Sequence, residues 1–400
     1  MCYHILMVIK YKLPRNWMIY DKASIVDQLV NAKAALIALK TIPYQKSWAR
    51  ELQIVQLKRE IAGTSRIEGA DFTDRELDDA LKENIEQLYT RSQRQVASTV
   101  KAYRWIAELE DDRPVNGELI CNIHKIIITD ADDDHCPPGV LRVQDENVTF
   151  GTPKHRGCEG GEQCYNAFRL LCQAINQDFR GHDQLIQSLA IHYHFAAMHP
   201  FLDGNGRTAR ALEALMLQKI GLKDSLFIAM SNYYYEEKNE YLKTLANVRA
   251  SDHNLTAFIL FGLKGIEKQC KRLSDEIKKN ISKVLFRNMM FNLFTRLQTK
   301  KTRIIAERQI EILKILLDES YELHKLYTKV GLIYKNLRNP WKAYIRDLIH
   351  LIDLNTIKAI EDGDTFNLII KLEWATEITE SEFYEKIKKL PKSKTHSLLT

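Results

Sequence analysis

The chain has 400 residues, of which 45% are apolar, and its formal net charge is +6. This apolar share excludes a disordered chain and suffices for roughly two or three domains with hydrophobic cores. The seven cysteines are odd in number and irregularly spaced, which excludes a disulfide framework and makes a reducing, cytoplasmic location the expectation.

The first predicted region, residues 1–110, is rich in helical patterns. Its opening apolar run, residues 5–9, is too short to cross a membrane and lacks a small-residue cleavage site, so we expect no membrane partner. Residues 64–69 read, by themselves, as a helix C-terminus followed by a glycine cap. Residues 71–76 predict the start of the next helix.

The second predicted region, residues 111–262, contains one hairpin signal among helices. Residues 138–151 place β-branched residues on both sides of an Asp145–Asn147 turn, which predicts a β-hairpin flap over about residues 138–156. An exposed hairpin edge can hold an extended peptide through main-chain hydrogen bonds. A hairpin that merely closes the fold accounts for the same pattern.

The most informative segment is residues 199–210, which lies between two stretches of helical apolar spacing. Pro200 discourages helix at the preceding residue, so the first helix is expected to end near His199. Gly204 and Gly206 can adopt positive φ, which lets successive N–H groups converge at the N-terminus of the next helix. This geometry predicts a phosphate site.

The side chains of this segment each suit a task in phosphate chemistry. Asp203 is a hard oxygen ligand that suits Mg²⁺ shared with substrate phosphates. Asn205 can hold a phosphate oxygen through its amide, and Arg207 and Arg210 share a helix face and match phosphate oxygens. His199, with an ordinary pKa of about 6.5, can accept a proton near neutral pH. Together they predict nucleotidyl or phosphoryl transfer.

Other phosphate and metal motifs fail on spacing. An EF-hand needs ligands where Arg207 and Ala214 stand. The histidines are not spaced as in a zinc protease, and no Gly-Lys-Ser/Thr follows the glycines as in a Walker loop.

Residues 199–210 read His-Pro-Phe-Leu-Asp-Gly-Asn-Gly-Arg-Thr-Ala-Arg and resemble the Fic-family signature, His-x-Phe-x-Asp/Glu-Gly-Asn-Gly-Arg-x-x-Arg, at every defined position. The resemblance implies a mainly α-helical, Fic-type core with a β-hairpin flap. It implies an adenylyltransferase that uses ATP and Mg²⁺ and moves AMP onto a Ser, Thr or Tyr hydroxyl of a target protein or of the chain itself.

The resemblance also assigns roles within the motif. His199 would be the general base and Asp203 the Mg²⁺ ligand. The cradle for the transferred phosphate would be Gly204, Asn205 and Gly206. The outgoing phosphates would be held by Arg207 and Arg210.

Residues 64–69 resemble the inhibitory helix of the same family, Ser/Thr-x-x-x-Glu-Gly/Asn. On this resemblance Thr64, Glu68 and Gly69 are regulatory, and Glu68 forms a bidentate pair with Arg210 that displaces the γ-phosphate. Autoinhibition is the expected consequence.

Two further groups follow from the resemblance. The family's flap pairs with the segment that carries the target hydroxyl, which implies a target-binding role for Val148, Thr149 and Phe150. Tyr234 and Asn239 are expected on the adenine side.

The C-terminal third has a different character. Residues 264–308 hold thirteen Lys and Arg against four Asp and Glu, and a basic helical linker is expected over residues 263–308, with nucleic-acid contact as the alternative to a solvated face. Apolar stripes over 309–317, 326–337 and 340–351, followed by a hairpin around residues 361–364, resemble a winged helix-turn-helix domain over residues 309–375. A tail, residues 376–400, follows.

The sequence does not decide which partners other than the target this chain binds. The helix in the recognition position offers Lys342, Arg346 and His350 but also Asp347 and Asp353, so its basic character is modest. DNA contact and a dimer-forming role, giving a homodimer, are both retained. Two alternatives to AMP transfer are also retained: removal of AMP with Glu68 orienting water, and a nucleotide-sensing, DNA-binding regulator.

Overall fold

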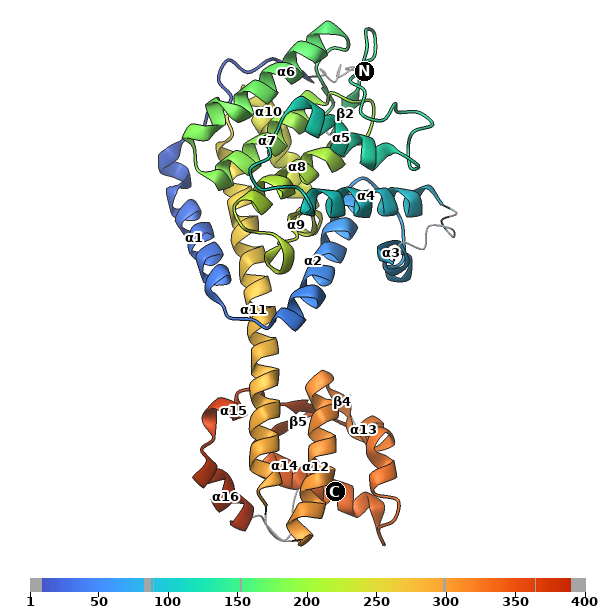
Figure 1. Cartoon of the computed structure of the whole chain (residues 1–400), viewed down its shortest axis with the longest axis vertical. Helices are drawn as coiled ribbons and strands as arrows, with labels where there is room; N and C mark the ends of the chain where they lie inside the picture. The colour runs from blue at the N-terminus through green and yellow to red at the C-terminus, as the bar shows by residue number, and fades with distance from the viewer. Residues whose placement is uncertain are drawn as a thin grey trace, which may run out of the picture. The chain divides into compact units, whose positions relative to one another are not determined.

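The computed structural model describes residues 9–82, 88, 90–151, 153–297, 300–363 and 365–389. Most of the apolar run at residues 5–9 and the end of the expected tail, residues 390–400, lie outside these ranges. The chain forms two compact units, residues 1–274 and 275–400, and helix α11 (Thr256–Thr295) contributes to both (Figure 1). Among the described helices, none combines the length and the apolar character that a membrane crossing requires.

The first unit is mainly helical and carries one small sheet. Its helices are α1 (Lys22–Thr41), α2 (Lys46–Ile67), α3 (Asp74–Leu81), α4 (Arg91–Ala107), α5 (Gly117–Ile128), α6 (Glu162–Asn176), α7 (Gln184–Met198), α8 (Asn205–Lys219), α9 (Met230–Glu236) and α10 (Lys238–Ala250), with 3-10 turns η2 (Asp178–Gly181) and η3 (Asp224–Leu226). The sheet has the order β1 (Ile9–Lys10), β3 (His155–Arg156), β2 (Thr149–Phe150). The expected N-terminal region, residues 1–110, therefore belongs to the same unit as the predicted core.

Helices α7 and α8 form the centre of the first unit (Figure 1). Every residue of α7 from Leu185 to Met198 is buried, and its polar side chains are paired rather than exposed. His192, for example, bonds Glu213 on α8 and the Tyr241 hydroxyl at 2.8 Å. The predicted helix-loop-helix is confirmed, and it places the segment between the two helices at the edge of this packed pair.

Helix α2 is held against α9 by a close approach. A Cβ at Gly63 would collide with the backbone of Ser231, so the glycine permits the contact. Glu60, three residues earlier, accepts the Ser231 N–H at 2.8 Å. Because residues four apart share a helix face, Thr64 and Glu68 continue this face toward α8.

The flap differs from its prediction. Strands β2 and β3 are antiparallel, with Phe150 opposite His155, and the chain reverses between residues 151 and 154. A turn at Asp145–Asn147 flanked by strands is therefore wrong, because residues 138–148 form turns and coil. The buried guanidinium of Arg142 explains this course: it donates to the carbonyls of His199 at 3.0 Å and Glu146 at 2.6 Å, which binds the segment to the 199–210 loop.

Strand β1 decides which edge of the flap is open. It pairs in parallel with β3, so β3 has a neighbour on both sides. Within the described residues β2 is left as an edge strand.

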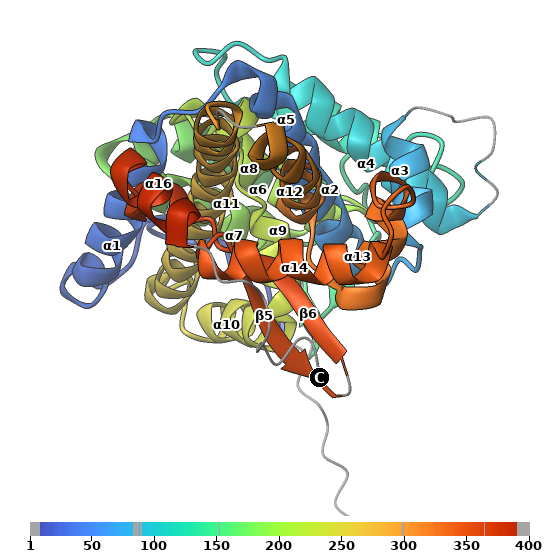
Figure 2. The ribbon, with the colours of Figure 1, turned by 90° about the horizontal axis from the view of Figure 1, so that it is seen from below.

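The second unit contains three main helices and a sheet. Its elements are α12 (Lys300–Asp318), β4 (Tyr321–Glu322), α13 (Leu323–Val330), η4 (Gly331–Ile333), α14 (Pro340–Asp353), β5 (Ile357–Asp362), β6 (Thr365–Ile370), α15 (Trp374–Glu377) and α16 (Glu380–Lys389). The sheet order is β4-β6-β5, and both pairs are antiparallel. The three helices and the hairpin predicted from the sequence are present in that order, and the hairpin lies beside α14 (Figure 2).

Two expectations for this region change. The C-terminal half of α11 buries Phe286, Met290 and Phe294 in the core of the second unit, so residues 263–308 are not a separate linker. Asp347 is fully buried and pairs with Arg308 at 2.7 Å, so it does not belong to the polar face of α14. Helical spacing alone cannot separate a buried ion pair from a surface charge.

Candidate active site

His199 lies directly after α7 in the left-handed region, with φ of 54°. Its Nδ1 bonds the Ala196 carbonyl at 2.8 Å, and because a carbonyl only accepts, Nδ1 carries the proton and Nε2 is free in the neutral ring. The ring stacks on Phe150 with centroids 3.8 Å apart. Burial lowers the pKa of His199 to about 4, so the imidazole is in its basic form at neutral pH.

Asn205 closes the loop after His199. Its Oδ1 accepts the Phe201 N–H at 2.9 Å, and its Nδ2 donates to the Phe201 carbonyl at 2.8 Å. The side chain is 1% exposed, so the expected contact between its amide and a phosphate oxygen does not fit this arrangement. Phe201 is fully buried and stacks on His124, which agrees with packing that fixes the loop.

The two glycines of the loop act differently. Gly204 has φ of 70°, as expected, and a Cβ there would also lie 2.7 Å from Ile128. Gly206 is helical, contrary to the expectation of positive φ, and its missing side chain instead makes room for the Glu68 carboxylate. No side chain caps the N-terminus of α8, so the N–H groups of its first turn remain suited to an anion.

Arg207 is buried beside this helix N-terminus. Its Nη2 donates to Asp132 at 2.6 Å, whereas Nε and Nη1 are buried without a partner. Buried donors in native proteins are nearly always bonded, so these two atoms fit a phosphate oxygen.

Arg210 is paired with the end of α2. Its Nε donates to the Thr64 hydroxyl at 2.7 Å, and its Nη2 donates to the Glu68 carboxylate at 2.5 Å. The predicted ion pair is present, but only one arm of the fork reaches Glu68, because Thr64 takes the other. Gly69, with φ of 89°, ends the helix immediately after Glu68.

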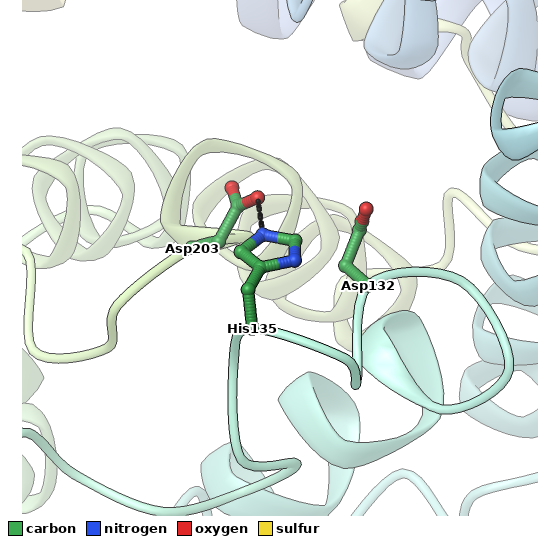
Figure 3. Close-up of side chains that lie close together, drawn as sticks. All are labelled: Asp132, His135 and Asp203. Atoms are coloured by element: carbon green, nitrogen blue, oxygen red, sulfur yellow. Dashed lines mark hydrogen bonds and ion pairs between the residues drawn. The ribbon is translucent and has the colours of Figure 1, made fainter.

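Asp203 lies in the same loop, on the side that faces His135 (Figure 3). Its Oδ2 bonds His135 Nε2 at 2.9 Å, and its Oδ1 accepts the Gly204 N–H at 2.6 Å. Burial alone would raise the pKa of Asp203, but these hydrogen bonds lower it below its usual range. The side chain is 39% exposed, which leaves a carboxylate open to solvent.

Asp203, His135 and Asp132 each offer a ligand atom, and these atoms lie within 4.8 Å of one another (Figure 3). Asp132 is a poor ligand, since it accepts hydrogen bonds from Arg91 and Arg207, at 2.6 Å each. The donor set therefore fits Mg²⁺ held by the Asp203 carboxylate and substrate phosphates, and it does not fit a closed three-residue metal site.

The two residues expected near adenine differ in exposure. Tyr234 is fully buried, donates to Glu213 at 2.8 Å and stacks on Tyr241, so its expected contact with adenine is wrong. Asn239 is exposed at the start of α10. An aromatic cluster at helical spacing indicates core as readily as a base-binding surface, and here the core accounts for it.

The three flap residues also differ in exposure and in their contacts. Thr149 is exposed on the open strand β2, whereas the Val148 carbonyl is bonded by the Gly157 N–H at 3.1 Å. Phe150 is half-buried, because its ring lies against His199 and 5.1 Å from the Arg249 guanidinium carbon.

Three contacts in the site were missed by sequence reasoning: Phe150 on His199, Arg249 on Phe150, and Asp132 on Arg207. Asp132 begins an acidic run directly before His135, which is the only sequence signal for this group. The other two contacts join segments that no local pattern connects.

Comparison with known proteins agrees with this geometry. Residues 114–217 match the sequence model of the Fic/DOC family. A Fic family protein from Desulfovibrio desulfuricans G20 is similar in structure, with a TM-score of 0.56 and 15% identity, over 90% of this chain and 98% of that one. Fic-1 from C. elegans superimposes with a TM-score of 0.54 and 18% identity, over 64% of this chain and 74% of that one.

A Fic-domain signaling protein from Bacteroides thetaiotaomicron VPI-5482 has a TM-score of 0.51 and 19% identity, over 61% of this chain and 94% of that one. At these identities the structures establish a shared fold. The matched range contains α5 to α7, the 199–210 loop and nearly all of α8. Residues 114–217 of this chain are therefore a domain of the Fic/DOC family.

Proposed function

We propose that this protein is an adenylyltransferase that moves AMP from ATP onto a hydroxyl of a target protein, and that Glu68 restrains it. The observation that carries the proposal is the buried, neutral His199 with its free Nε2, in a loop that leads directly into the uncapped N-terminus of α8 and the unpaired donors of Arg207. A base next to an anion site is the arrangement that attack on a phosphate requires.

The proposed reaction uses these positions. His199 Nε2 takes the proton of the target hydroxyl, and the oxygen forms a bond to the α-phosphorus of ATP. The bond from that phosphorus to the bridging oxygen breaks, and pyrophosphate leaves. Arg207 and the first-turn N–H groups of α8 stabilise the charge that develops on the phosphate oxygens.

Asp203 would hold Mg²⁺, which would neutralise charge on the phosphates when bound. Thr149 on the open edge of β2 is placed to pair with an extended segment of the target. Such pairing uses main-chain groups, so it accepts targets of varied sequence.

Glu68 supports the regulatory part of the proposal. Its carboxylate bonds Arg210 and fills the space above Gly206, so it competes with a phosphate for the same fork. The neighbouring Thr64 holds Arg210 in this paired position.

ATP labelled on the α-phosphate tests the transfer. Label is expected to enter protein, and His199→Ala is expected to abolish the labelling. His324→Ala, an exposed histidine of the second unit, is the matched control and is expected to label normally. Full labelling of the His199→Ala variant would remove His199 as the base.

The exposed carboxylate of Glu68 also suits a second reaction, removal of AMP by a water molecule that Glu68 orients. Release of AMP from a modified protein, lost in Glu68→Gln, would assign this direction. Retention of release in Glu68→Gln would exclude it.

A further inference from the structure

A cavity of about 660 Å³ lies in the first unit beside strands β1 and β3. It is lined by β1 and the residues that follow it, by β3, by Ala197 near the end of α7, and by the end of α10 with the turn after it. This volume is in the range of small-molecule sites. None of the loop residues 199–210 lines it.

The lining is strongly basic. Five cationic side chains surround the cavity against one carboxylate, Asp252; they are Lys10, Lys12, Arg15, Arg156 and Arg249. Among the described residues, no ion pair involves any of these five. The positive charge is therefore concentrated and uncompensated at one place.

Several residues of the lining also carry polar atoms that are buried without a partner. They are the Tyr11 hydroxyl, both ring nitrogens of His155, and the Nε atoms of Arg156 and Arg249. His155 is only 1% exposed, so its ring lies behind the surface of the cavity. These atoms are closed to solvent, so a ligand in the cavity would first meet the exposed charges of Lys10, Lys12 and Arg15.

We propose that this cavity binds a small phosphate-bearing molecule at a site separate from the 199–210 loop. Phosphate matches the lining because it carries charge and several acceptor oxygens, and because arginine forks bind it in two places. A carboxylate carries one charge and two oxygens, so it matches a lining of five cationic residues less well.

The position of Arg249 connects this site to His199. Its guanidinium carbon lies 5.1 Å from the Phe150 ring, and the same ring stacks on His199. An anion bound to Arg249 changes the charge beside the Phe150 ring. Because the same ring stacks on His199, binding in the cavity affects His199 through Phe150.

Inorganic phosphate is the probe, and the histidine ring signals of the full-length protein are the readout. The His155 signal, identified by its loss in His155→Gln, is expected to shift and saturate as phosphate is added. The double variant Lys12→Gln/Arg156→Gln is expected to weaken this binding about tenfold or more. Arg169→Gln, an exposed arginine on α6, is the matched control and leaves it unchanged.

A second variant separates the cavity from the catalytic loop. Arg207→Gln is expected to leave the His155 response intact, because Arg207 does not line the cavity. AMP, titrated in the same way, identifies the source: tighter binding than inorganic phosphate assigns an organic phosphate, and equal binding assigns the free ion. A His155 signal that never moves, or a response that is lost in Arg207→Gln but kept in the double variant, overturns the proposal.

Discussion

At the scale of single residues, the burial of His199 predicts an unusual pH profile. Burial lowers its pKa to about 4, and the base acts only in its neutral form, which exists above that pKa. We therefore expect AMP transfer to persist well below pH of about 6.5, the ordinary histidine pKa, and to fall near pH of about 4. The acid limb of kcat/KM, measured with α-labelled ATP, checks this.

A variant of Phe150 tests the cause of the low pKa of His199. Phe150→Ala removes the ring that stacks on His199 and admits water, so the pKa of His199 is expected to rise toward its ordinary value. The pH at which kcat/KM falls on the acid side should rise accordingly. An unchanged limb in this variant would show that Phe150 does not cause the burial.

At the scale of elements, helix α2 leads into Glu68, whose contact with Arg210 we propose to be inhibitory. Glu68→Gly removes the carboxylate from Arg210, and a charge-assisted hydrogen bond of this kind corresponds to about 1.5–3 kcal/mol. We expect labelling to rise on the order of tenfold, which is about 1.4 kcal/mol in the barrier.

Glu51→Gln is the control for this prediction, because Glu51 is an exposed acid on the same helix. It should label at the wild-type rate. Equal rates for Glu68→Gly and wild type would leave Glu68 as a helix-end residue without a regulatory role.

Glu60 anchors the same helix and predicts a pH-dependent stability. Burial raises its pKa to about 7, against the hydrogen bonds from Ser231 and Tyr103. A raised native pKa means that the folded protein binds this proton more tightly than the unfolded chain does. The stabilisation from protonated Glu60 is therefore fully present below pH of about 4.5, and it is lost as pH rises through about 7. The loss corresponds to roughly 3 kcal/mol.

Denaturant unfolding of wild type and Glu60→Gln, compared over this pH range, checks the Glu60 prediction. The uncharged amide should remove the loss, so the stability difference between the two proteins should change with pH. A constant difference would show that Glu60 stays ionised in the folded protein.

At the scale of the whole molecule, the two units predict separable effects on stability. Asp347→Ala leaves Arg308 buried without its partner, and breaking a buried pair in this way costs about 3–5 kcal/mol. We expect calorimetry of the full chain to show a lower transition for the second unit, with the transition of the first unit and the labelling activity unchanged. Glu361→Gln, exposed on the β5–β6 hairpin, should change neither. A matching fall in the first unit would contradict their independence.

The site was predictable where its chemistry is local in the chain. Residues 199–210 are consecutive, so their order alone places a base, a carboxylate and two arginines around one helix N-terminus. Helical spacing likewise located α7, α8 and the three main helices of the second unit, because an apolar face must repeat with the helix period. The pairing of Glu68 with Arg210 was reached only through family resemblance.

The tertiary structure alone decided which side chains remain available. Tyr234 bonds Glu213 in the core, and the Asn205 amide bonds the backbone of its own loop. The flap hairpin turns several residues later in the chain than expected. Asp132 bonds Arg207 from a distant segment. Burial and partnership depend on packing between segments far apart in the chain, which no local pattern encodes. The sequence by itself determined the order of groups that predicts a phosphate site after His199, and packing determined that His199 is neutral there and that Arg210 is paired with Glu68.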